Sequence, residues 1–138
     1  MPTLLEHGGP VELWAGWVMQ LPSAYHQRNE DGSWSAWGAD WTVDVQIVEV
    51  AGDATGKSVS PQNILGLDRK ITLSGMGWIG HTDQLKEAEN EQVIFRLTGN
   101  LAAENTMMFC WISYFKEEQF SFARELIEAV VHHAPNIV

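Results

Sequence analysis

Residues 41–50 read WTVDVQIVEV and give the clearest indication of the fold. Apolar and polar side chains alternate along this stretch, with the apolar ones at Trp41, Val43, Val45 and Ile47. Alternation of period two places the apolar side chains on one face of a strand and the polar ones on the other. The stretch therefore predicts a half-buried strand, which is most common in antiparallel sheets.

Three further segments predict strands of the same sheet. Residues 13–21 carry apolar side chains at every second position, and the pattern ends at Pro22. Residues 92–98 alternate in the same way. Residues 106–115 are apolar on both parities, which predicts a central strand with a helix or second layer above it. Together with the turn signals between them, these segments predict an antiparallel β-sheet of about five to seven strands.

Two helices complete the predicted architecture. Residues 60–66 favour a short crossover helix, because Ser60 can cap it, Pro61 fits its first turn and Gly66 suits its end. Residues 121–133 place apolar side chains in one stripe, which predicts a long C-terminal helix packed on the sheet. The chain is therefore predicted to be a single α+β domain over residues 1–138, with residues 1–12 as an irregular N-terminal arm.

Composition narrows the classes of partner. The 138 residues include 8 Lys and Arg against 18 Asp and Glu, so the net charge is −10. Nucleic acid and anionic membranes repel such a surface, and neither is expected as a partner. The charge fits either plain solubility or an acidic face that recruits a basic protein. The first residues lack the basic start and apolar run of a signal peptide, so a soluble, cytoplasmic protein is expected.

Motifs for catalysis or metal binding are weak. The five His residues show no HxxxH spacing, and one Cys gives no CxxC, so no metal site is expected. Gly75, Gly77 and Gly80 form G-x-G-x-x-G, but the surrounding pattern is antiparallel, which favours a glycine-rich hairpin over a dinucleotide site. Cys110 lies in an apolar run and is expected to be a buried, inert thiol. No cofactor and no catalytic residue is predicted.

Seven Trp residues are the most unusual feature of the composition. Most should fill the core, Trp17, Trp41 and Trp111 among them. Three others stand beside Gly or Ser, which cannot cover a large ring, and are predicted to be partly exposed on a binding surface: Trp34, Trp37 and Trp78. The polar run after Pro22 supplies weaker candidates in Tyr25, His26 and Arg28.

The order of the segments resembles the Mog1/PsbP-like fold. In that fold an early strand leads into a Pro-x-x-Tyr/Trp segment, and a final strand leads into a helix of the Ala-Arg-x-Ile/Leu type. Residues 16–22 with Tyr25, and residues 108–115 followed by 122–127, are similar to these pieces. The resemblance implies a non-enzymatic binding protein, small chaperone or assembly factor, and it carries over no catalytic residue.

Three functions remain open from the sequence. The first is a small acidic protein-binding or adaptor/chaperone-like domain without catalysis. The second is a small-molecule-binding domain or minor enzyme with an apolar pocket walled by Trp34, Trp37 and Trp78. The third is a homo-oligomer-forming domain of no further chemistry, assembled through an exposed sheet edge.

Overall fold

The computed structural model describes residues 3–5, 9–22, 25–30, 33–49 and 73–133. Its strands are β1 (Thr3–Leu5), β2 (Gly9–Glu12), β3 (Trp17–Leu21), β4 (Tyr25–Glu30), β5 (Ser33–Trp37), β6 (Trp41–Glu49), β7 (Leu73–Gly75), β8 (Trp78–Glu89), β9 (Gln92–Ala103), β10 (Thr106–Tyr114) and β11 (Val131–His132). A 3-10 turn, η1 (Glu117–Gln119), leads into the helix α2 (Phe120–Glu128). No helix among these residues is long and apolar enough to cross a membrane.

The strands form two antiparallel sheets rather than one. The larger sheet has eight strands in the order β1-β4-β5-β6-β10-β9-β8-β7, and the smaller has three in the order β11-β3-β2. The predicted α+β class, with a sheet of about five to seven strands and a long C-terminal helix, is therefore wrong. The described chain is mostly β, and the predicted crossover helix at residues 60–66 lies outside the described residues.

The C-terminal helix is shorter than predicted because its last residues pair with a strand. Helix α2 ends at Glu128, five residues before the predicted end of the helix at residue 133. Instead, Val131 and His132 form β11 opposite Val18 and Trp17 of β3. Pairing in a sheet overrides the helical spacing here, and the β-branched side chain of Val131 suits a strand.

The N-terminal region also differs from the predicted irregular arm. The described residues 3–5 pair with β4 as β1, and residues 9–12 pair with β3 as β2. The strand predicted from residue 13 begins only at Trp17, because Ala15 (φ 57°) and Gly16 (φ 87°) have left-handed backbone conformations that belong to a turn. Backbone pairing with β4 and β3 therefore gives the described residues of the N-terminal region a strand conformation, and such pairing is not apparent from composition.

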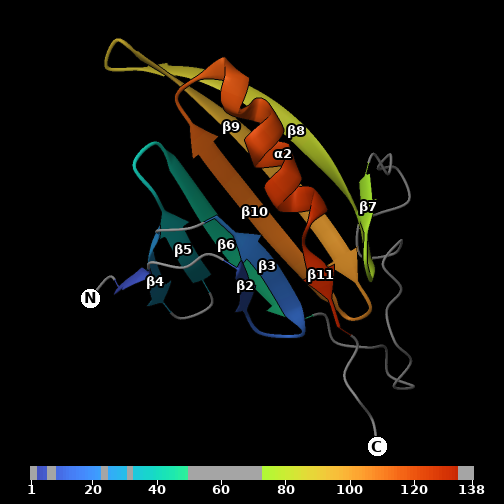
Figure 1. Cartoon of the computed structure of the whole chain (residues 1–138). Coiled ribbons are helices and arrows are strands. Elements are labelled where there is room, and N and C mark those ends of the chain that lie inside the picture. The colour runs from blue at the N-terminus through green and yellow to red at the C-terminus, as the bar shows by residue number, and fades with distance from the viewer. Residues whose placement is uncertain (1–2, 6–8, 23–24, 31–32, 50–72, 134–138) are drawn as a thin grey trace, which may run out of the picture.

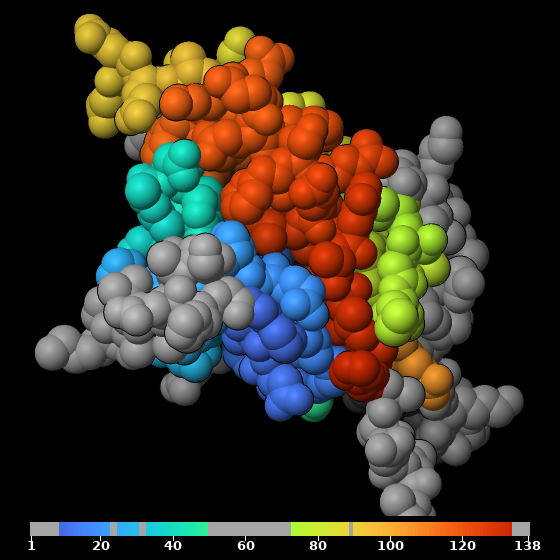
Figure 2. Space-filling model, in the orientation of Figure 1, coloured from blue at the N-terminus to red at the C-terminus, as the bar shows by residue number. Residues whose placement is uncertain are grey.

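One face of the large sheet is covered by a second layer. Figure 1 shows α2 lying across β9 and β10 and the three-stranded sheet lying in front of β6, on the same side. Figure 2 shows these two elements as a continuous cover over that side of the molecule. We call the covered side the inner face. The hydrophobic core between the layers is a single cluster that joins residues of both sheets and the helix, such as Met19, Ile112 and Ile127.

The opposite side of the large sheet, which we call the outer face, carries the alternate side chains of the same strands. On β10 the inner-face residues are buried without exception, and the outer-face residues are half-buried at Met107, Phe109, Trp111 and Ser113. Strand β10 is central, as predicted, with β6 and β9 on its two sides. Among the described residues, however, the second layer covers its inner face alone.

Candidate functional site

The predicted exposure of Trp34 is wrong, because its ring lies in the core with 1% of its surface accessible. Trp34 occupies an inner-face position of β5 opposite Val45, and its indole Nε1 donates a hydrogen bond of 3.0 Å to Gln27 Oε1. The neighbouring Ser33 and Ser35 point to the other face of the sheet, since successive side chains alternate. The small side chains of Ser33 and Ser35 therefore affect only the outer face. They have no influence on the burial of Trp34 on the inner face.

Trp78 is also buried, with 3% of its surface accessible, which contradicts the prediction that it is exposed. Its strand partner is Gly75, and a Cβ at that glycine would collide with the indole ring. Trp78 Nε1 donates a hydrogen bond of 2.7 Å to the carbonyl oxygen of Val130. The glycine beside Trp78 thus makes room for the ring to lie flat against the sheet, where the chain after α2 covers it.

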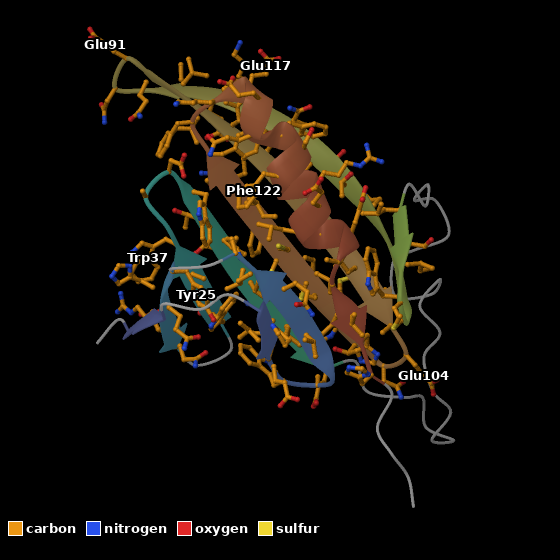
Figure 3. All side chains as sticks on the ribbon, in the orientation of Figure 1. Tyr25, Trp37, Glu91, Glu104, Glu117 and Phe122 are labelled. Carbon is orange, nitrogen blue, oxygen red and sulfur yellow. The ribbon has the colours of Figure 1, made fainter. Side chains whose placement is uncertain are left out.

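Trp37 is the one member of the predicted trio on the outer face. It is half-buried at the end of β5, and its ring stacks on His26 of β4 with centroids 5.6 Å apart and planes 11° from parallel. Figure 3 shows Trp37 and Tyr25 on the neighbouring strands β5 and β4, with Trp37 at the margin of the sheet. The three Trp residues therefore do not gather at one site.

The weaker polar candidates divide between the two faces. Tyr25 is buried on the inner face, and this burial raises the pKa of its hydroxyl. His26 and Arg28 lie on the outer face of β4, where Arg28 forms an ion pair with Glu30. Trp17 and Trp41 are buried, as predicted, whereas Trp111 is half-buried on the outer face.

The outer face of β10 carries three large apolar side chains that the described second layer leaves uncovered. We call Met107, Phe109 and Trp111 the aromatic strip. The rings of Phe109 and Trp111 stack with centroids 6.2 Å apart and planes 19° from parallel. Apolar residues on both parities of this segment predict two covered faces, whereas the described second layer covers only the inner one. The apolar side chains on the other face of β10 are half-buried and are not part of the core cluster.

Polar side chains flank the aromatic strip on both sides. On β6, Asp44 stands directly opposite Trp111 and accepts a hydrogen bond of 2.7 Å from the Ser35 hydroxyl. On β9, Arg96 Nε donates to Ser113 Oγ at 3.2 Å, and Asn100 stands opposite Phe109. An apolar centre with a polar rim is the usual anatomy of a protein interface.

The described residues contain no cluster of side chains with the composition of a metal site. No group of three or more His, Cys, Asp or Glu side chains could hold an ion within the described part of the chain. The nearest polar network joins His81 Nε2 to Asn100 Nδ2 at 3.0 Å and His81 Nδ1 to Asp83 Oδ2 at 3.7 Å. This network lies on the outer face beside Phe109, where it contributes polar groups to the rim.

Three exposed glutamates mark the two ends of the long strands (Figure 3). Figure 3 shows Glu91 at the tip of the β8–β9 hairpin, Glu104 at the β9–β10 turn and Glu117 beside the start of the helical segment. Glu91 and Glu117 lie toward one end of the long strands, and Glu104 lies at the other (Figure 3). Glu104 is therefore separate from the other two, and all three add to the negative charge of the molecule.

Comparison with known proteins gives a fold without a function. No protein-family model and no curated protein matches this chain. A crystal structure of a protein from Bacteroides thetaiotaomicron VPI-5482 is similar, with a TM-score of 0.67 and 15% sequence identity over 92% of this chain and 49% of that one. This chain thus spans about half the length of that protein. At this identity the likeness shows the fold alone, and the resemblance to the Mog1/PsbP-like fold stays a hypothesis.

Proposed function

We propose that this protein is a small acidic protein-binding domain without catalysis and that it binds its partner through the outer face of the large sheet. The observation that carries the proposal is the aromatic strip. Trp, Phe and Met side chains stand in a row on a central strand whose other face is fully buried. These residue types are enriched in protein interfaces, where burial of aromatic rings supplies much of the binding energy.

The position of the strip supports binding of a macromolecule over binding of a small ligand. A small-molecule site buries most of its ligand in a concave cavity. The pocket expected from Trp34, Trp37 and Trp78 is not formed, because Trp34 and Trp78 are buried and β6, β10 and β9 lie between β5 and β8. The outer face instead offers a row of half-buried side chains along one strand, which suits a broad contact.

The proposal is tested by comparing two variants in capture experiments. The first variant, Phe109→Ala with Trp111→Ala, removes both rings of the strip. The control, Phe115→Ala, removes an aromatic ring that is 42% exposed just beyond the end of β10. Each protein is immobilised, exposed to extract of the native host and analysed by quantitative mass spectrometry. A partner that binds the wild type and the control, but not the double variant, supports the proposal.

Two outcomes argue against it. An identical set of captured proteins for all three forms would show that the aromatic strip is not the binding surface. A wild type that sediments as a dimer, with a monomeric double variant, would show that a second copy of this chain covers the strip. Far-ultraviolet circular dichroism and thermal melting confirm that each variant is folded before the comparison is made.

A further inference from the structure

Asp44 is a carboxylate on the outer face with an aromatic residue on each neighbouring strand. It is half-buried on the outer face of β6, with Ser35 opposite it on β5 and Trp111 opposite it on β10. The Ser35 hydroxyl donates to Asp44 Oδ1 and holds the side chain in place. Within the described residues, no Lys, Arg or His forms an ion pair with Asp44.

The two arginines that the structure describes on the outer face, Arg28 and Arg96, form ion pairs with other residues. Arg28 pairs with Glu30 on the same strand. Arg96 donates from Nε to Ser113 and lies with Nη1 3.7 Å from Glu87 Oε2. Each of these two guanidinium groups therefore has a glutamate of its own, and among the described residues none of the ion pairs includes Asp44.

Aromatic rings stand on both sides of Asp44. Trp111 is its direct neighbour across β10, and residues directly opposite in an antiparallel pair have Cβ atoms about 5 Å apart. Trp37 is opposite Thr42, which lies two residues before Asp44. Trp37 is therefore a diagonal neighbour of Asp44, and residues in this relationship are about 7–8 Å apart. Both rings are half-buried, so part of each is accessible from the outer face.

We propose that Asp44, Trp111 and Trp37 form a subsite for the guanidinium of an arginine side chain on the protein partner. This inference rests on the proposed function, since it places one anchor of the partner on the same face. A guanidinium is planar, stacks on indole rings and donates paired hydrogen bonds to a carboxylate, so it satisfies both kinds of group at once. The net charge of −10 also favours the approach of a basic surface.

A bound metal ion does not fit the same position. Hard divalent cations take six or more oxygen ligands, or keep several waters beside one or two carboxylates. Asp44 is a single carboxylate, and no group of three metal-ligating side chains is present in the described part of the chain. The neighbouring indole rings offer no ligand atom to such an ion, whereas they offer a stacking surface to a guanidinium.

The subsite can be probed with short peptides and the indole resonances of the protein. The probe is an acetylated, amidated peptide with two arginines among glycines, compared with its lysine and citrulline analogues at millimolar concentration. The arginine peptide should shift the indole resonances of Trp37 and Trp111, the lysine peptide should shift them less, and the citrulline peptide should leave them in place. The indoles of Trp17, Trp34 and Trp78 donate internal hydrogen bonds and serve as references.

A charge-matched pair of variants decides whether Asp44 carries the binding. Asp44→Asn removes the charge but keeps an oxygen that can accept the Ser35 hydrogen bond, and it should weaken arginine binding about tenfold. The control, Glu125→Gln, removes an equal charge from the exposed surface of α2 and should change binding by less than about twofold. A second variant, Trp37→Ala, tests the ring separately and should also weaken binding.

Three results would overturn the subsite: equal weakening by Asp44→Asn and Glu125→Gln, equal shifts with the citrulline peptide, or no shift of Trp37 and Trp111 at any concentration. The failure of the subsite is distinguishable from that of the proposed function. If Asp44→Asn binds the captured partner normally while the Phe109→Ala, Trp111→Ala variant does not, the outer face remains the binding surface and only the arginine subsite is lost.

Discussion

Trp17 and Thr106 tie the two sheets together through one buried hydrogen bond. The indole Nε1 of Trp17, in the three-stranded sheet, donates to the Thr106 hydroxyl at the start of β10 with a distance of 3.0 Å. The same hydroxyl donates to the carbonyl oxygen of Val48 at 3.1 Å, on the neighbouring strand β6. Both Trp17 and Thr106 are buried, so water cannot replace either bond without reorganisation.

Replacement of Thr106 by Val tests this connection. Valine matches threonine in shape but has no hydroxyl, so the indole N–H of Trp17 and the carbonyl of Val48 would each lose a partner. An unsatisfied buried polar group costs about 1–3 kcal/mol, and the free energy of unfolding in urea should fall by at least that amount. Thr106→Ser, which keeps the hydroxyl, should lose less. Equal losses for the two variants would mean that the methyl group, and not the hydrogen bond, stabilises the contact.

His132 should make the protein less stable in mild acid. Burial lowers the pKa of His132 below its ordinary value of 6.5, and the neighbouring His133 lowers it further, against the opposing effect of the hydrogen bond to Ala15. That bond joins Nε2 to the Ala15 carbonyl at 2.9 Å, and the ring packs on Trp17 with centroids 4.7 Å apart. Because a carbonyl only accepts, Nε2 carries the proton of the neutral ring.

The direction of the pH effect follows from this depressed pKa. Below about pH 6.5 the unfolded chain binds a proton at residue 132 more readily than the folded chain, so stability falls as the pH falls through that value. The variant His132→Gln keeps a donor at the position of Nε2 but does not titrate. Between about pH 7 and 5, urea unfolding should therefore show a larger loss of stability for the wild type than for the variant. Parallel pH profiles would contradict the assignment.

The sequence predicts strands well where one face is apolar and the other polar. The pattern of residues 41–50 indicated β6, and residues 106–115 indicated a central strand, because burial of one face requires alternation. Strand β8 was missed. Beyond Gly80 it is mostly polar on both faces, and it is held by pairing along its whole length with β9 and not by a hydrophobic pattern.

The candidate site was predicted less well than the strands, for a related reason. Small residues beside Trp34 and Trp78 predict exposure of the rings, but in the structure Ser33 and Ser35 lie on the opposite face from Trp34, and Gly75 makes room for the ring of Trp78. Local sequence shows which residues of a strand share a face. It does not show which of the two faces the second layer will cover. That choice depends on where α2 and the three-stranded sheet pack, which is a property of the whole chain.

Gly77 should be required at the junction of the two sheets. It has φ 87°, and a Cβ on it would collide with the carbonyl oxygen of His132, which belongs to β11. A left-handed conformation alone costs an L-residue about 1–2 kcal/mol, and the collision adds to this. Gly77→Ala should therefore lower the free energy of unfolding by more than about 2 kcal/mol. Gly9→Ala is the matched control, since Gly9 has φ 132° and nothing within 4 Å. Similar losses at both positions would show that the close approach of β11 is unimportant.

Cys110 should react only when the protein unfolds. Burial, with a smaller contribution from the nearby charge of Asp44, raises the pKa of the Cys110 thiol to about 12. The reactive form of cysteine is the thiolate, which is scarce at pH 8 with such a pKa and is also shielded from solvent. Modification by Ellman's reagent in native buffer should be slow and should accelerate across the urea transition. Rapid native reaction, at a rate close to that in urea, would contradict the burial of this side chain.

Leu126 should be a principal contact between α2 and the large sheet. It lies with Ala123 and Ile127 on the buried side of the helix, within the core cluster that joins the two layers. Truncation of a buried leucine removes apolar contacts and leaves a cavity, so Leu126→Ala should lower the free energy of unfolding by about 2–5 kcal/mol. The neighbouring Glu125 is exposed, and Glu125→Ala should change it by less than about 0.5 kcal/mol. Urea denaturation of both variants measures the difference.

A loss below about 0.5 kcal/mol for Leu126→Ala would show that the helix does not pack on the sheet in solution, and the inner face would then be open as well.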